Sequence, residues 1–273
     1  EWLYQTYGRT FAETFPMVYG AKYHTTTLYR LTTDWIGPRM YQPSLEEIVR
    51  GALPGTEADV HYVDSFRYPT QGGFESYLKP FAQRFDVRLS HQVIGVDAKG
   101  KRLRFSNGVV DSWSELISSV PLPELIPLID GAPDDVRQAA RKLAFTTAVL
   151  INIGLRRDDI SETAITYFYD PDVSISRVNL PYLFSAQNAP PGCGSIQAEI
   201  YFSPKYKPLL AHPQDLINGA VDDLRRCGFI RPEDELLLCA AAVNKYANVI
   251  YDTDRAAALA TVHGFLDEVG VHY

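Results

Sequence analysis

The spacing of hydrophobic residues changes repeatedly along the chain, and each change predicts a different element. Residues 74–85 place large apolar side chains at helical intervals, directly after the glycine pair Gly72-Gly73. Residues 91–110 instead alternate apolar and polar positions around an Ala-Lys-Gly turn and a second turn at Asn107-Gly108, which is typical of a hairpin. Residues 67–110 therefore predict a strand end, a glycine turn, an amphipathic helix and a hairpin.

The second half of the chain predicts strands separated by a few helices. Residues 115–129 indicate a short buried strand broken by Pro121, and Pro133 with the acidic residues after it starts a helix. The remaining predictions are β-rich runs at 146–155, 164–170, 174–180 and 195–203, an amphipathic helix at 213–229 and a strand at 235–247. The pattern favours an α/β fold with α+β character and intimately joined parts.

The two ends of the chain resemble the interior of a fold. Residues 1–50 are aromatic and mainly helical in pattern, and Ser44 with Glu47 forms a capping-box signature. Residue 1 is glutamate, and the last residues give a helix, a glycine turn and a strand that is barely begun. We therefore expect a piece of a longer polypeptide, whose missing flanks would leave apolar surface uncovered and favour self-association into a homo-oligomer.

Composition narrows the possible functions. The chain has 273 residues, 46% hydrophobic and 22% charged, with a net charge of −7, so a general nucleic-acid surface is not expected. No apolar run approaches the length of a membrane span, so no membrane partner is expected either. The three cysteines lack C-x-x-C spacing, which favours neither a disulfide framework nor a zinc site and makes a cytoplasmic location the expectation.

Familiar catalytic motifs do not occur in the sequence. It has no G-x-S-x-G, no H-E-x-x-H and no other histidine spacing that indicates a nucleophile or a metal site. It also has no G-x-G-x-x-G, so the chain by itself carries no complete dinucleotide-binding motif. Neither a metal ion nor a catalytic residue can be assigned from motifs.

The order of elements nevertheless resembles one superfamily. A P-x-x-G-G turn and helix, a hairpin with V-I-x-V-D, an N-G turn and then "LISSVPLPEL" are similar to the middle of FAD-dependent enzymes of the amine oxidase, protoporphyrinogen oxidase and UDP-galactopyranose mutase superfamily. The resemblance implies a substrate domain with a mixed or antiparallel sheet and helices, interleaved with part of a Rossmann-like FAD-binding domain. It divides the chain into substrate-domain segments at 1–66 and 131–250 and FAD-domain segments at 67–130 and 251–273.

The mutase branch gives the closer local match. "TTDWIGPRM" and "TYFYDPDVSISRVNLPYLFSAQNAP" are similar to mutase segments that hold a UDP-sugar. The resemblance implies a small anionic substrate, such as a UDP-sugar, bound by Arg39, Arg177, Tyr167, Phe184 and Asn188. An arginine fork suits a diphosphate, because it binds phosphate oxygens bidentately and keeps its charge. Phe184 stands where those mutases have tyrosine, and Tyr246 and Tyr251 are out of register, so the chemistry could differ from sugar ring contraction.

The same resemblance implies FAD as the cofactor of the full-length protein. The residues that it places near the dinucleotide are Gly72, Gly73, Val93, Ser119 and Pro121. For the glycine pair, tight packing of the turn is an alternative to cofactor contact, and for Val93 a plain core position is one. For Arg39 the alternative is a helix-capping arginine or one in a surface salt bridge, and for Arg177 it is a residue on the solvent face of a strand. Because the Rossmann glycines and a final flavin-contacting segment are not in this chain, we expect it to bind FAD weakly or not at all.

Three functions remain open at this point. The first is the substrate-binding core of a flavoprotein of the UDP-galactopyranose mutase type. The second is an FAD-dependent oxidoreductase of the amine oxidase or protoporphyrinogen oxidase type, in which an aromatic-lined apolar pocket would matter more than arginines. The third is a non-catalytic fragment or binding module. The isolated chain is expected to be inactive in all three cases.

Overall fold

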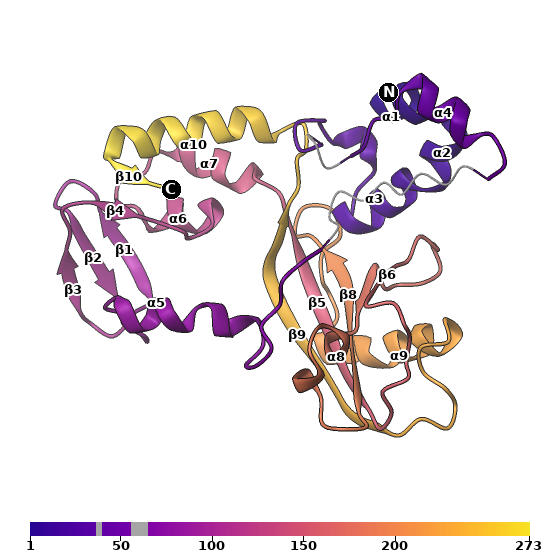
Figure 1. The fold of residues 1–273 in the computed structure, drawn as a ribbon. Helices are drawn as coiled ribbons and strands as arrows, with labels where there is room; N and C mark the ends of the chain where they lie inside the picture. Colours follow the sequence, from indigo (N-terminus) through magenta and orange to yellow (C-terminus); the bar gives the residue numbers. More distant parts are fainter. Residues whose placement is uncertain (37–39, 56–64) are drawn as a thin grey trace.

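The structure is a computed structural model that describes residues 1–36, 40–55 and 65–273. Its largest feature is a five-stranded antiparallel sheet with the strand order β6-β7-β8-β5-β9. The strands are β5 (Phe145–Leu155), β6 (Ile165–Tyr167), β7 (Arg177–Asn179), β8 (Gly194–Phe202) and β9 (Leu236–Val249). Within the described residues, β5 and β9 are the longest strands, and their pairing joins the middle of the chain to its C-terminal part (Figure 1).

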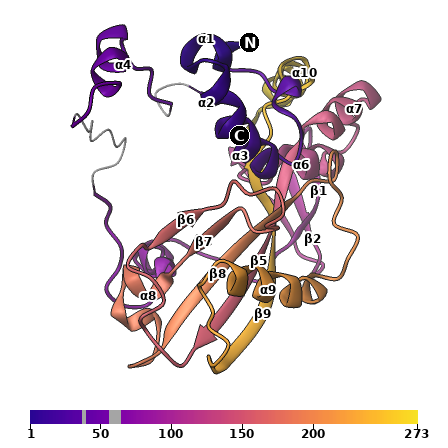
Figure 2. The ribbon, with the colours of Figure 1, turned by 90° about the vertical axis from the view of Figure 1, so that its right-hand side faces the viewer.

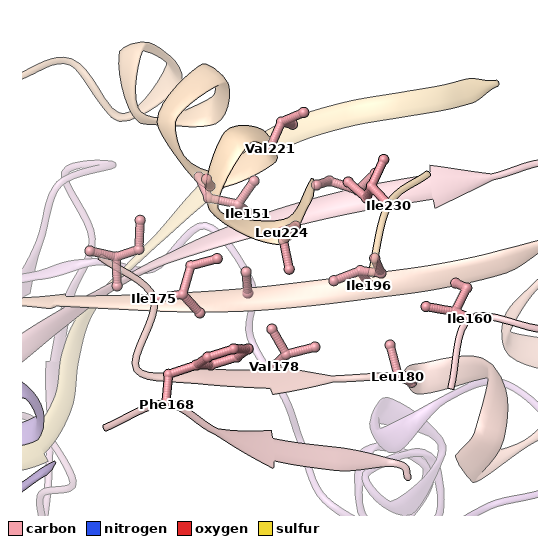
Figure 3. Packing of buried hydrophobic residues seen from close by; sticks show 14 of the residues in the cluster. Ile151, Ile160, Phe168, Ile175, Val178, Leu180, Ile196, Val221, Leu224 and Ile230 are labelled. Atoms are coloured by element: carbon pink, nitrogen blue, oxygen red, sulfur yellow. The ribbon is translucent and has the colours of Figure 1, made fainter. Parts of the chain in front are cut away.

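One face of this sheet is covered by a helix. Helix α9 (Leu216–Arg226), preceded by the 3₁₀ turn η5 (Pro213–Asp215), lies across the strands (Figure 2). Figure 3 shows Leu224 of α9 pointing toward sheet residues that include Ile196, and both side chains are fully buried. Alternate strand positions point to this side, because successive side chains of a strand point to opposite faces. The burial of these aliphatic side chains is the main core of the molecule.

A second core lies beside the first (Figure 1). Its elements are the antiparallel strands β1 (Val93–Asp97), β2 (Arg102–Phe105) and β3 (Val110–Ser112), the helices α6 (Leu122–Leu128), α7 (Asp134–Lys142) and α10 (Arg255–Val269), and the parallel pair β4 (Leu116–Ile117) and β10 (Val271–His272). Val96, Ile126 and Leu266 are buried together there. Residues near position 96 and residues near the C-terminal end of the chain therefore pack in the same core.

The N-terminal residues form short helices above the large sheet. They are α1 (Trp2–Tyr7), α2 (Arg9–Thr14) and α3 (Pro16–His24), followed by the turn η1 (Leu28–Arg30) and by α4 (Leu45–Gly51). The predicted capping box is confirmed, since Ser44 and Glu47 exchange both side-chain to backbone hydrogen bonds at the start of α4. From residue 65 the chain leads to η3 (Phe74–Tyr77) and α5 (Lys79–Arg84) (Figure 1).

Most predicted elements are confirmed, and two differ. The single helix predicted after Gly73 is divided into η3 and α5, because Pro80 lacks an N–H and begins a helix more readily than it continues one. The strand predicted to be broken by Pro121 is only β4, whose Ile117 is exposed. Pro121 instead precedes α6, and its carbonyl accepts hydrogen bonds from the amides of Glu124 and Leu125.

The fold class is confirmed as a mixture of helices and largely antiparallel sheets. The division of the chain into domains stays a prediction, although α7 of the 131–250 segment packs with α6 and α10 rather than with α9. Among the described residues, no helix combines the length and the apolar character needed to cross a bilayer. The same residues contain no group of three or more metal-ligating side chains.

Candidate functional site

The large sheet has a second face that is polar. Its side chains alternate with those that pack on α9, and the cross-strand register aligns them in rows. We call this surface the polar face and define it by Asn152, Tyr167, Arg177, Asn179, Gln197, Glu199 and Tyr201. A row of polar side chains on the inner part of a sheet requires partners, because burying polar groups without hydrogen bonds is costly.

Two predicted substrate residues lie together on this face. Tyr167 of β6 and Arg177 of β7 are direct cross-strand partners. Arg177 is two-thirds buried, and its Nη2 donates a hydrogen bond to Glu199 Oε1 over 2.7 Å. Burial opposes the charge of the guanidinium, but Glu199 outweighs that effect, so the pKa of Arg177 is raised above its ordinary value. Arg177 is therefore a permanent cation in this site.

Glu199 holds the polar face together. Its buried carboxylate accepts hydrogen bonds from Arg177, from Asn179 Nδ2 at 2.8 Å and from the Tyr201 hydroxyl at 2.5 Å. Burial and the bond to Glu199 both raise the pKa of Tyr201, so its hydroxyl stays protonated and keeps donating. These three donors explain how a carboxylate can lie inside the sheet.

Helix α3 covers one end of the polar face. The Tyr19 ring packs edge-on against Tyr167 with centroids 5.5 Å apart, and the Tyr23 ring packs against Tyr201 at 5.1 Å. Lys22 lies between these tyrosines in the sequence, and its Nζ donates to the carbonyls of Phe168, Asp170 and Ile175 at 2.8–3.1 Å. None of these three residues of α3 was predicted from the sequence to be functional, although positions 19, 22 and 23 share one helical face.

A cavity lies where the two cores meet. It has a volume of about 250 Å³ and is lined mostly by apolar side chains from the start of α6, the start of β5, the end of β9 and α10. Pro121, a predicted cofactor residue, lines it together with Phe145 and Leu259. Asn248 supplies a polar edge and accepts a hydrogen bond over 2.7 Å from the hydroxyl of Tyr23. Tyr23 therefore contacts Asn248 at the cavity and Tyr201 on the polar face.

The other predicted substrate residues have different surroundings. Phe184 in the short helix α8 (Pro181–Phe184) packs against the rings of Phe66 and Tyr68. Asn188, at the end of the turn η4 (Ala186–Asn188), donates through Nδ2 to the Pro181 carbonyl and so closes its own loop. Arg39 lies outside the residues that the structure describes. A substrate role for these three residues stays a prediction.

The remaining predicted cofactor residues lie on the surface of the second core and beyond it. Val93 is the half-buried first residue of β1 and pairs with Phe105 of β2, while Ser119 is exposed in the turn before α6. Gly72 and Gly73 have φ values of +79° and +63°, which favour glycine at both positions. The backbone conformation accounts for the glycine pair, so a contact with a cofactor is not needed to explain it.

Comparisons with known proteins support the predicted fold. No protein-family model and no curated protein sequence matches the chain. Similar solved structures include a reduced UDP-galactopyranose mutase, with a TM-score of 0.86, 21% identity, 99% of this chain covered and 59% of the mutase. A putative protoporphyrinogen oxidase from an Exiguobacterium species has a TM-score of 0.57 and 15% identity, and the match covers 73% of this chain and 45% of the oxidase. A putrescine oxidase variant has a TM-score of 0.52 and 13% identity, and the match covers 73% of this chain and 46% of that oxidase.

These neighbours define a class of fold. They are members of the FAD-dependent amine oxidase type superfamily that the sequence motifs resemble. Within that class, the mutase is similar over nearly the whole of this chain, which spans about three fifths of the mutase length. At 21% identity or less the likeness establishes the fold, and chemistry has to be argued from the site.

Proposed function

We propose that the chain is the substrate-binding part of an FAD-dependent flavoenzyme that acts on a nucleotide sugar, as a UDP-galactopyranose mutase does. The observation that carries this proposal is the placement of Arg177 beside Tyr167 on the polar face, on a sheet whose β5 strand begins at the cavity lined by Pro121. An anion held at Arg177 would have its attached sugar directed along the sheet toward the cavity.

Arg177 keeps hydrogen-bonding capacity for an anion. Glu199 takes a bond from Nη2, while the buried Nε has no partner in the described part of the chain. A guanidinium carries five N–H donors, so several remain for phosphate oxygens. Because Glu199 offsets the charge of Arg177, a diphosphate needs a second cation at the site. Arg39 stays our prediction for that second cation.

The cavity fits the apolar part of a flavin better than any other part of FAD. Its lining of Pro121, Leu122, Phe145 and Leu259 would exclude water from a flat ring system, and Asn248 offers a hydrogen-bonding edge. Val93, Ser119 and the Gly72-Gly73 pair stay predictions for the adenosine and pyrophosphate parts. FAD, when bound, supplies the redox or nucleophilic chemistry, and the residues of this chain bind and orient the substrate.

Calorimetry with UDP tests the proposal. Arg177→Ala is expected to weaken UDP binding by roughly 1.5–3 kcal/mol, the range for hydrogen bonds to charged groups. The matched control is Arg156→Ala, which breaks an exposed arginine–glutamate pair with Glu235; the two residues lie directly after β5 and directly before β9. Arg177→Lys keeps the charge beside Glu199 and guards against misfolding of the alanine variant. Equal UDP affinity in all four proteins, or no UDP binding by the unmodified chain, would contradict the nucleotide-sugar proposal.

The apolar cavity favours a second candidate, an FAD-dependent oxidoreductase on an amine or a porphyrinogen-like substrate. Its lining is almost entirely apolar and aromatic, and an oxidase pocket needs no arginine. This candidate predicts that the chain does not bind UDP, and that the flavin spectrum of the full-length FAD-bound protein changes when an amine or a porphyrinogen is added. A chain that binds neither UDP nor any FAD would fit the third hypothesis, a non-catalytic module.

The chain as it stands is expected to bind FAD weakly or not at all. A titration of FAD into the chain, followed by flavin fluorescence, measures this directly. A stoichiometric yellow complex purified with the chain would contradict the expectation and strengthen both flavoenzyme candidates.

A further inference from the structure

Strand β9 forms one edge of the large sheet. It has 14 residues, and among the described strands β5 is its only neighbour (Figure 1). Residues 236–244 of this strand include no charged residue and no proline, the residue types that usually protect an edge strand from pairing with another chain. Lys245 follows them, but its ammonium is paired with Glu124. The backbone of β9 therefore presents a long edge that no free charge protects.

The register between β5 and β9 determines which backbone groups of β9 face outward. In an antiparallel pair, residues that exchange hydrogen bonds with the neighbouring strand alternate with residues whose N–H and C=O point away from it. Ala241 is aligned with Ile151 of β5, and its N–H and C=O bind a side chain outside the sheet. Ala241 therefore faces outward, and by the same alternation so do Cys239 and Val243.

One side chain covers the centre of this edge. Gln214 Nε2 donates a hydrogen bond to the Ala241 carbonyl over 3.2 Å, and Gln214 Oε1 accepts one from the Ala241 N–H over 3.3 Å. A neighbouring strand would exchange the same two bonds with Ala241. In the described part of the chain, no hydrogen bond is made to the outward N–H and C=O of Cys239 and Val243. Gln214 therefore takes the place of a further strand at one position only.

The turn η5 holds Gln214 at this edge. His212 Nδ1 accepts a hydrogen bond from the Gln214 N–H over 3.4 Å, and Pro213 starts the turn. Directly after it, Leu216 and Ile217 of α9 pack against the buried residues of the large sheet. The backbone of the turn is thus fixed, whereas the Gln214 side chain is exposed. Water can replace the strand as its hydrogen-bond partner, so the amide can leave the edge.

We propose that the outer edge of β9 is a strand-addition surface for a second copy of β9, and that Gln214 keeps this surface closed. Two antiparallel strands related by a two-fold axis are self-complementary, so the same segment serves in both copies. With the axis at Ala241, Cys239 of each copy lies opposite Val243 of the other. The nearest charge, Lys245, then comes opposite Leu237, so no like charges meet.

The hydrogen bonds of Gln214 decide whether the copies pair. Association of two unmodified chains breaks the Gln214–Ala241 bonds in both copies before the strands can exchange their own. Gln214→Ala removes this cost and should lower the dissociation constant for self-association by about tenfold or more. Gln214→Glu should not lower it, because the carboxylate still accepts from the Ala241 N–H and places a charge at the edge.

Analytical ultracentrifugation measures the dissociation constant, and hydrogen exchange at low and high protein concentration shows where the copies meet. In Gln214→Ala, the amides of Cys239 and Val243 should become protected as the concentration rises. Adding Val243→Pro removes one outward N–H and should restore the dissociation constant of the unmodified chain. The matched control is Gln187→Ala, which removes an exposed glutamine side chain from η4 and should leave the dissociation constant unchanged.

The proposal is overturned if Gln214→Ala associates no more tightly than the unmodified chain. It is also overturned if Val243→Pro leaves the tighter association intact, because the copies then meet through another surface, such as η3 and α5. Urea unfolding shows whether each variant is folded. Where Val243→Pro unfolds the chain, the concentration-dependent protection of the Cys239 and Val243 amides in Gln214→Ala decides the outcome by itself.

Discussion

The large sheet and the segment around α5 both carry regularly spaced hydrophobic side chains, but those of the sheet are buried and those around α5 are exposed. In the sheet, Ile151 and Leu224 are completely buried between the strands and α9. Phe74 of η3, Phe81 of α5 and Leu78 between them are each more than 60% exposed. The comparison shows that a hydrophobic period predicts an element, whereas burial depends on a second surface that the period does not specify.

The large sheet also differs from the second core in how its charges are paired. On the sheet side, buried Asp223 accepts hydrogen bonds from the amide and hydroxyl of Ser174 and from Arg226, and Ser174 with Arg226 keeps the pKa of Asp223 low despite burial. Beside β1–β3, the pair of Arg104 and Asp130 is nearly half exposed and screened by water. Stability should therefore be concentrated in the sheet and α9.

The largest expected effect is a difference in the free energy of unfolding between two variants, each with one side chain truncated, in the large sheet or in α5. Ile151→Ala should lower the free energy of unfolding by about 2–5 kcal/mol, because it removes buried methyl groups and leaves a cavity. Phe81→Ala should change it by less than about 0.5 kcal/mol, because its ring is exposed. Urea unfolding of both variants measures the difference. Similar losses from the two substitutions would show that α5 is covered in solution.

The next effect is a pH dependence of the free energy of unfolding. It is expected to arise from His24, at the end of helix α3, which covers the polar face. Burial lowers the pKa of His24 to about 4, so the folded protein holds it neutral. The unfolded chain takes up a proton below about pH 6.5, so stability is complete above that pH and falls as the pH drops toward 4, by at most about 3 kcal/mol.

Urea midpoints at pH 7.5 and pH 5 measure this loss. His24→Gln should flatten the dependence in that window, because glutamine does not titrate. Parallel pH dependence in the variant and the unmodified chain would exclude His24 as the cause.

A loss of about 1–2 kcal/mol is expected from Lys22→Met. The substitution removes the donor that holds three carbonyls of the β6–β7 connection against α3, while desolvation of the ammonium offsets part of the stabilisation. Hydrogen exchange should then increase in residues 168–175 more than in β5. Exchange that increases equally in both places would indicate global destabilisation and contradict a local role.

The smallest effect on stability is expected from the double substitution Phe74→Ser and Phe81→Ser. Both rings are exposed, so the free energy of unfolding should change by less than about 0.5 kcal/mol. Binding of a hydrophobic dye and self-association should nevertheless decrease, because exposed apolar surface is removed. Leu210→Ser is the control, because Leu210 is 92% exposed but lies away from η3 and α5. Analytical ultracentrifugation reports the association. An unmodified chain that is strictly monomeric would contradict the predicted role of this surface.

Much of the local structure could be predicted because its causes are local. The β-rich run at 146–155 is β5, the Ala-Lys-Gly turn connects β1 and β2 in a hairpin, and the capping box begins α4. The split at Pro80 and the helix after Pro121 were missed, because one proline can either break an element or start one. The packing of the neighbouring turns decides between these outcomes.

The candidate site was predicted only in part. Motif resemblance selected Tyr167, Arg177 and Pro121, and the structure places the first two side by side and the third at a cavity. It did not select Glu199, although Glu199 organises the polar face. A glutamate in an alternating strand looks like a solvent-facing residue until the neighbouring strands and α3 are placed around it.

The sequence by itself determined the secondary elements, the alternation that gives the sheet one apolar and one polar face, and the permanent charge of Arg177. These properties depend on backbone geometry, side-chain spacing and intrinsic chemistry within a few residues. Only the tertiary structure decided that Arg177 meets Glu199, that Lys22 reaches carbonyls about 150 residues later, and that Tyr23 and Asn248 join the cavity to the polar face. Those contacts depend on strand register and helix packing, which bring together residues that no local pattern connects.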